Sequence, residues 1–214
     1  MNTLTRFFAA LTLAVVTLTA HADLERDIRY LQSRWAEVNY QLEGKTRLAA
    51  FAQLSTAADD VTTAYPDRAE GWIWSGIIKS THAGAKGGLG ALTLAKSAKK
   101  DLEQALKIDP GALQGSAYTS LGTLYASVPG WPLGFGDSAK AEQLLKQALA
   151  ANPDGIDSNY FYGDYLLKEK RYNDAKVFFL KAQRAAPRPG RELADAGRQG
   201  EIAAALAHIA QQLN

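Results

Sequence analysis

The chain has 214 residues, with 24 lysines and arginines, 22 aspartates and glutamates, and a formal net charge of +2. It contains no cysteine, which excludes disulfides and a cysteine nucleophile. The near balance of charge, without a dense basic block, argues against a nucleic-acid binder. Packing between side chains must therefore supply the stability of the fold.

The first 22 residues have the three-part layout of a secretory signal peptide. Arg6 precedes an apolar run from Phe7 to Leu18, and two small residues, Ala20 and Ala22, follow at a cleavage-site spacing. The run is shorter than the roughly 20 residues that cross a bilayer. We expect cleavage after residue 22, a periplasmic location, and a mature chain that is not embedded in a membrane.

Residues 23–66 are predicted to form a degenerate N-terminal helical hairpin. Its first helix carries one apolar stripe with members three or four residues apart, which is typical of a helix packed on one side: Leu24, Ile28, Leu31, Trp35, Val38 and Leu42. In its second helix, Leu54, Ala58 and Val61 occupy the positions that hold two small residues and one large residue in the following units. Pro66 closes the hairpin.

Residues 67–187 repeat one pattern three times. Each unit has a glycine in its first helix and, in its second helix, a large residue between two alanines. A glycine within a helix costs about 1 kcal/mol relative to alanine, so its recurrence indicates close packing of the two helices. We expect Gly76, Gly122 and Gly163 to lie at these contacts and not to face water, and we expect Leu102, Leu121, Leu145 and Phe179 to be buried.

Two units are longer than the third. The prolines that close successive units, Pro66, Pro110, Pro153 and Pro187, lie 44, 43 and 34 residues apart. Both surpluses fall between the helices of a unit, so the two insertions should emerge at the same edge and be spatial neighbours. The first, residues 80–97, has four glycines around Lys86 and is expected to be a flexible connector or, alternatively, an anion or substrate contact.

The second insertion, residues 127–141, places Trp131 and Phe135 among prolines and glycines, which shape a loop rather than loosen it. Two interpretations stay open. Both aromatic side chains fold back as a lid on the core, or they rim a pocket for a ligand or partner. Residues 188–214 are predicted to form a C-terminal capping helix with a polar outer face.

The unit ending at Pro187, "NYFYGDYLLKEKRYNDAKVFFLKAQRAAP", resembles the tetratricopeptide repeat (TPR), a helix-turn-helix unit of 34 residues. The resemblance implies an all-α, right-handed solenoid of about four hairpins with the C-terminal helix as a cap. It also implies a non-catalytic protein that binds a protein or peptide partner on its concave face. The positions expected to contact such a partner are Ile73, Ile77, Thr119, Thr123, Tyr160 and Asp164, with Trp131 and Phe135 on the inserted loop.

A narrower resemblance comes from "LGTLYASVPGWPLGFGDSAKAEQLLKQALAANP", which looks like the T-component of tripartite ATP-independent periplasmic (TRAP) transporters. That resemblance implies an accessory subunit that binds a partner or a small apolar ligand. The chain departs from those proteins in being shorter and in lacking their lipid-bearing cysteine.

Catalysis is not expected. After removal of the signal peptide only His82 and His208 remain as histidines, and no metal-ligand cluster or nucleophile motif accompanies them. We expect no catalytic residue, cofactor or metal.

Overall fold

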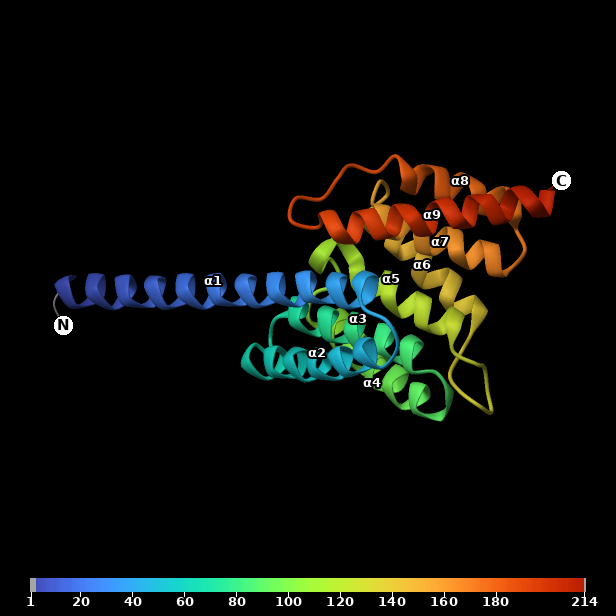
Figure 1. The fold of residues 1–214 in the computed structure, drawn as a ribbon. Coiled ribbons are helices and arrows are strands. Elements are labelled where there is room, and N and C mark those ends of the chain that lie inside the picture. The colour runs from blue at the N-terminus through green and yellow to red at the C-terminus, as the bar shows by residue number, and fades with distance from the viewer. Residues whose placement is uncertain (1–2, 214) are drawn as a thin grey trace.

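The computed structural model describes the backbone of residues 3–213 and the side chains of residues 22–213 apart from residue 89. Helices account for nearly all of this part of the chain (Figure 1). Their bounds are α1 Thr3–Gln41, α2 Gly44–Ala64, α3 Ala69–Lys86, α4 Gly88–Ile108, α5 Ala112–Ser127, α6 Ser138–Ala151, α7 Ile156–Lys168, α8 Tyr172–Gln183 and α9 Glu192–Leu213.

The helices pack as consecutive antiparallel hairpins. Contacts join α1 to α2, α3 to α4, α5 to α6, and α7 to α8, and each hairpin also contacts the next. This arrangement confirms the predicted all-α solenoid of about four hairpins followed by a C-terminal helix. The first half of α1 projects beyond α2 and the rest of the fold (Figure 1).

The predicted signal peptide lies mostly outside the described side chains, because these begin at residue 22. Its backbone from residue 3 onward is part of α1, and its cleavage stays a prediction. Within the described part of the chain, no helix combines the length and the apolar character required to cross a membrane.

The glycine positions confirm the predicted register of the repeats. A Cβ atom added at Gly76 would lie 2.7 Å from Cδ2 of Leu102, and one at Gly122 would lie 2.8 Å from Cγ of Leu145. At Gly163 the nearest atoms belong to the ring of Phe179, at 3.2 Å. Each glycine therefore faces the large residue of its own hairpin, and all six residues are buried.

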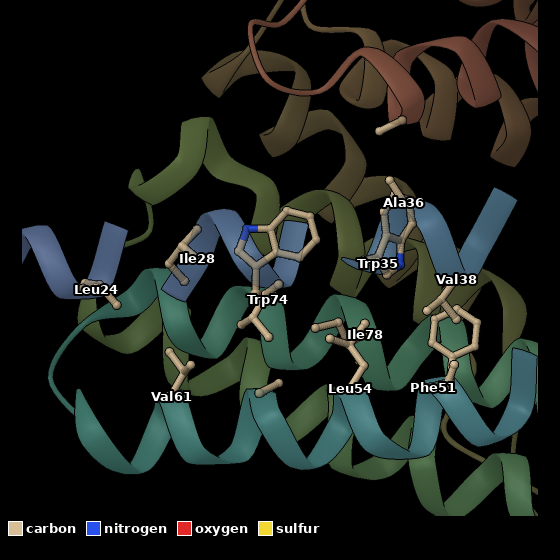
Figure 2. Packing of buried hydrophobic residues seen from close by; sticks show 14 residues of the cluster. Leu24, Ile28, Trp35, Ala36, Val38, Phe51, Leu54, Val61, Trp74 and Ile78 are labelled. Atoms are coloured by element: carbon tan, nitrogen blue, oxygen red, sulfur yellow. The ribbon is translucent and has the colours of Figure 1, made fainter. Parts of the chain in front are cut away.

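The alanines on either side of the large residues are fully buried, as the close approach of two helices requires. They are Ala98, Ala105, Ala141, Ala148, Ala175 and Ala182. The N-terminal hairpin uses larger side chains instead. Figure 2 shows Phe51, Leu54 and Val61 projecting from α2 toward α1 and α3, where they meet Val38, Ile78 and Trp74.

The expected flexible connector at residues 80–97 is wrong. Helix α3 continues to Lys86 and α4 begins at Gly88, so a single residue, Gly87 with φ +61°, separates them. The surplus residues lengthen both helices instead of forming a loop. Gly84 and Gly90 lie within the helices, whereas Gly87 and Gly88 have φ values of +61° and +60° and form the turn between them.

The second insertion is a loop, residues 128–137, between α5 and α6. Asp137 caps α6 as expected, with its side chain accepting a hydrogen bond from the backbone N–H of Lys140. A Cβ atom at Gly134 in this loop would lie 3.5 Å from Leu92 in the first insertion. The two insertions are therefore neighbours, as predicted.

Gly76 and Gly84 lie in the same helix and allow a matched comparison. A Cβ atom added at Gly76 would meet Leu102, whereas one added at Gly84 would have no neighbouring atom within 4 Å. We predict that Gly76→Ala lowers the free energy of unfolding by about 1–3 kcal/mol through overpacking. Gly84→Ala should be neutral or stabilising by up to about 1 kcal/mol. Urea titration measures both.

A Leu102→Ala background supplies the internal control, because it removes the side chain that the new methyl group would meet. The cost of Gly76→Ala should shrink in that background. Equal effects of the two glycine substitutions in the native chain would contradict the proposed close packing.

Candidate functional site

The first helices of successive hairpins form a continuous row. Helix α3 contacts α1 and α5, and α7 contacts α5 and α9, so α9 takes the place of a first helix in an unfinished fifth hairpin. The row does not stay open, since α9 also contacts α1. It therefore curls around a central space, and Figure 1 shows α9 and the C-terminal part of α1 on the same side of the molecule.

The contact between α9 and α1 depends on small residues of α9. Ala194 is 2 % exposed and belongs to the same hydrophobic cluster as the inward face of α1. A Cβ atom at Gly197 would collide with the ring of Tyr40 on α1. These residues are more than 150 positions apart in the chain, and the sequence did not indicate their contact.

A groove of about 1050 Å³ occupies the space inside the row. All three first helices of the regular hairpins line it, through residues such as Ile77 of α3, Ser120 of α5 and Phe161 of α7. The lengthened start of α4 adds Ala91 and Leu92. The first insertion thus contributes a wall of the groove, a role that its sequence did not reveal.

The start of α5 departs from regular helix where it borders the groove. Leu113, Gln114 and Gly115 have φ values of 47°, 55° and 73°, in the left-handed region. Such backbone is costly for residues other than glycine and must be held by its surroundings. Here Gln114 accepts a hydrogen bond from Asn152 at 2.9 Å, and both residues line the groove.

The predicted contact positions divide into two groups. Ile77, Thr119 and Thr123 line the groove, on α3 and α5. Ile73 was expected to be exposed, but it is fully buried beneath the groove surface. It lies one helical turn before Ile77 on the same face of α3, but there it packs against side chains of α4 and α5, which cover it.

Tyr160 and Asp164 of α7 do not line the groove. The Tyr160 ring packs 5.1 Å from Phe161 and 5.6 Å from Phe179, while Asp164 pairs with Lys168 at 2.8 Å. On this helix Phe161 lines the groove instead. A role in partner binding stays a prediction for all of the predicted positions.

The two aromatic residues of the loop behave differently from each other. Phe135 folds back onto Tyr125, with ring centroids 5.5 Å apart, and Lys99 lies over both rings. Trp131 is 90 % exposed. The interpretation of both as a lid therefore holds for Phe135 alone, and neither lines the groove, although Pro129 and Leu133 of the same loop do.

An ion-pair network forms one end of the groove. Asp157 at the start of α7 accepts hydrogen bonds from Arg188 at 2.6 Å and from Arg198 of α9 at 3.0 Å. Arg188 also pairs with Asp195 at 2.6 Å. Burial acts to raise the pKa of Asp157, but the charges of Arg198 and Arg188 outweigh it and lower this pKa to about 2.

Arg198 connects this network to the aromatic residues of α7. Its guanidinium carbon lies 4.1 Å from the centre of the Tyr160 ring and 4.5 Å from that of Phe161, and its side chain is 8 % exposed. Burial acts to lower the pKa of Arg198, but the charge of Asp157 outweighs burial and raises it. The predicted position Tyr160 therefore helps to hold α9 in place.

His82 of α3 packs against residues of α2. His82 is buried, stacks on Phe51 at 6.0 Å, and lies 3.2 Å from the hydroxyl of Ser55. Burial, with a smaller contribution from the charge of Lys86, lowers the pKa of His82. Within the part of the chain that the structure describes, no three metal-ligating side chains come together.

Comparisons with known proteins agree with this geometry. The family model of the tetratricopeptide repeat matches residues 133–196. The crystal structure of a thermophilic TPR protein from Thermus thermophilus is similar, with a TM-score of 0.56 and 18% sequence identity over 92% of this chain and 96% of that chain. No curated protein matches the chain.

The pKa of Asp157 leads to a prediction about acid stability. In the unfolded chain an aspartate titrates near pH 4, so the stabilisation by this carboxylate is present above about pH 4 and is lost as pH falls through about 2. We expect the native chain to be more stable than Asp157→Asn at neutral pH, with a difference that shrinks between pH 4 and pH 2.

Unfolding monitored by circular dichroism at a series of pH values measures this difference. Asp154→Asn is the matched control, because Asp154 is 87 % exposed and should give a small difference. A difference for Asp157→Asn that stays constant over the same interval would contradict the ionised, doubly paired carboxylate.

Proposed function

We propose that this chain, whose residues 133–196 match the tetratricopeptide repeat model, is a non-catalytic scaffold that holds a segment of a protein partner in its groove. The observation that carries the proposal is the continuity of the groove across α3, α5 and α7. Small side chains such as Thr119, Ser120 and Thr123 leave room along α5, so a bound segment can approach the helix closely.

The inserted loop provides a second surface for the same partner. Trp131 and Leu133 are 90 % and 74 % exposed, and large apolar side chains of this kind anchor protein interfaces. Leu133 also lines the groove, so a partner that leaves the groove at this edge meets the loop. The proposed contact surface thus includes Ile77, Thr119 and Thr123 in the groove and Trp131 on the loop.

The alternative is an accessory subunit similar to the T-component of TRAP transporters, which binds a small apolar ligand. The observation that favours it is the curling of the row of first helices, because the contact between α1 and α9 encloses the groove more than an open solenoid would. Leu92, Leu124 and Val128 give the enclosed space apolar walls. Such a ligand should raise the thermal unfolding temperature of the purified protein.

Groove and loop can be tested separately. We predict that Thr123→Trp, which fills the groove, reduces capture of the protein partner by at least tenfold, because the partner segment loses its place along α5. Trp131→Ala should reduce capture less, since it leaves the groove intact. Quantitative affinity capture from periplasmic extract, with unfolding curves for each variant, measures both effects.

Unchanged capture by Thr123→Trp, with loss of capture only by Trp131→Ala, would assign binding to the loop and contradict the groove. Capture that is insensitive to both substitutions would contradict the whole surface.

We also propose that the protein is exported to the periplasm. The support is the layout of residues 1–22, with Arg6 before the apolar run and small residues at the end. The protein purified from a periplasmic fraction should begin at Asp23 when its N-terminus is sequenced. An intact N-terminus in the cytoplasmic fraction would contradict export.

A further inference from the structure

Arg191 is a charged side chain of the groove that forms no salt bridge with any described residue. It lies in the segment before α9 and lines the groove. Its guanidinium carbon lies 5.0 Å from the centre of the Trp74 ring. Among the described residues it makes no side-chain hydrogen bond or salt bridge, and its Nε is buried without an acceptor.

Trp74 presents a second donor without an acceptor. This residue of α3 is 4 % exposed, lines the groove, and its indole Nε1 is buried without a hydrogen bond. The nearby Trp35 differs, because its indole donates to the hydroxyl of Thr81 at 3.0 Å. Figure 2 shows the Trp74 ring reaching from α3 to the level of α1. A buried donor without an acceptor costs about 1–3 kcal/mol, so two such donors in one groove require an explanation.

The carboxylates around Arg191 are committed to other arginines. Asp157 binds Arg188 and Arg198, and Asp195 binds Arg188. Burial, together with the charge of Arg188, lowers the pKa of Arg191. Asp157 and Asp195 act in the opposite direction, but neither accepts a hydrogen bond from Arg191, so a carboxylate from outside that does so would be favoured there.

We propose that Arg191 and Trp74 form a subsite for a carboxylate of the bound protein segment, with the guanidinium and the indole N–H as its hydrogen-bond donors. This inference rests on the proposed function of the groove. A carboxylate matches the site because it accepts several hydrogen bonds, and those it accepts from a guanidinium are charge-assisted. The apolar residues nearby, such as Ile77, would take the apolar neighbours of the acidic residue.

The carboxylate is that of an Asp or Glu side chain. The groove is larger than the subsite, since Gln32 of α1 and Ile156 of α7 also line it. A segment that follows the first helices therefore continues beyond Arg191 and reaches it with a side chain. A segment that ended at Arg191 would leave part of the groove unfilled.

Three blocked tripeptides test this subsite. They are acetyl-Leu-Glu-Leu-amide, its neutral counterpart acetyl-Leu-Gln-Leu-amide, and acetyl-Leu-Gln-Leu with a free C-terminal carboxylate. We expect the Glu peptide to bind about tenfold more tightly than the Gln peptide, the ratio that one charge-assisted hydrogen bond supplies. NMR titration measures each dissociation constant, and the indole N–H resonance of Trp74, assigned with Trp74→Phe, should move only with the Glu peptide.

Arg191→Met should abolish the preference for the Glu peptide, and Trp74→Phe should reduce it. Arg184→Met is the matched control, because it removes the same charge from an exposed position at the end of α8, outside the groove. It should keep the tenfold preference. Unfolding curves of the variants show whether each is folded, and Arg191→Lys, which keeps the charge, should retain part of the preference.

Equal binding of the Glu and Gln peptides would overturn the carboxylate subsite and leave the groove as a peptide site. Tighter binding of the free-acid peptide than of the Glu peptide would overturn the assignment to a side chain. A preference that survives Arg191→Met, or is lost in Arg184→Met, would overturn the role of Arg191. Absence of binding by all three peptides would overturn this inference, whereas the proposed function would fail only if Thr123→Trp also left partner capture unchanged.

Discussion

The close approach of paired helices at three glycines determines the rest of the structure. At Gly76, Gly122 and Gly163 the first helix of a hairpin lies directly against a large residue of the second helix, with fully buried alanines on either side. Because the same contact recurs in each hairpin, successive hairpins stack in one orientation and their first helices form a row. The groove is the inner side of that row, so its position follows from a packing constraint between backbones.

A second constraint gives the row its closed form. Helix α9 packs against α7 and also returns to α1, where Ala194 and Gly197 allow the approach. The paired charges of Asp157, Arg188 and Arg198 fix the start of α9 against α7. Burying such charges is costly unless they are paired, and here the pairing holds together the segment that carries Arg191. The polar end of the groove is thus a consequence of how the C-terminal helix is anchored.

Much of the fold could be predicted from the sequence because the evidence for it is local. The size pattern of glycine, large residue and alanine sets the register of each hairpin, and the structure confirms each glycine contact. The first insertion was misinterpreted because its glycines favour a loop locally, whereas α3 and α4 extend through Gly84 and Gly90 and turn sharply at Gly87 and Gly88. Ile73 was misplaced because side chains of α4 and α5 cover it, whereas Ile77, one helical turn later on the same face, reaches the groove. The contact of α9 with α1 and the unpaired donors of Trp74 and Arg191 were beyond prediction, since they join residues far apart in the chain.

The central claim is that the inner side of the row of first helices holds a partner segment. Hydrogen exchange of the protein with and without its captured partner tests it most directly, because exchange reports each helix separately. The account predicts added protection in α5, in α7 and in the segment around Arg191, with no change in α6 and α8 on the outer side. Protection confined to α6 and α8 would contradict it.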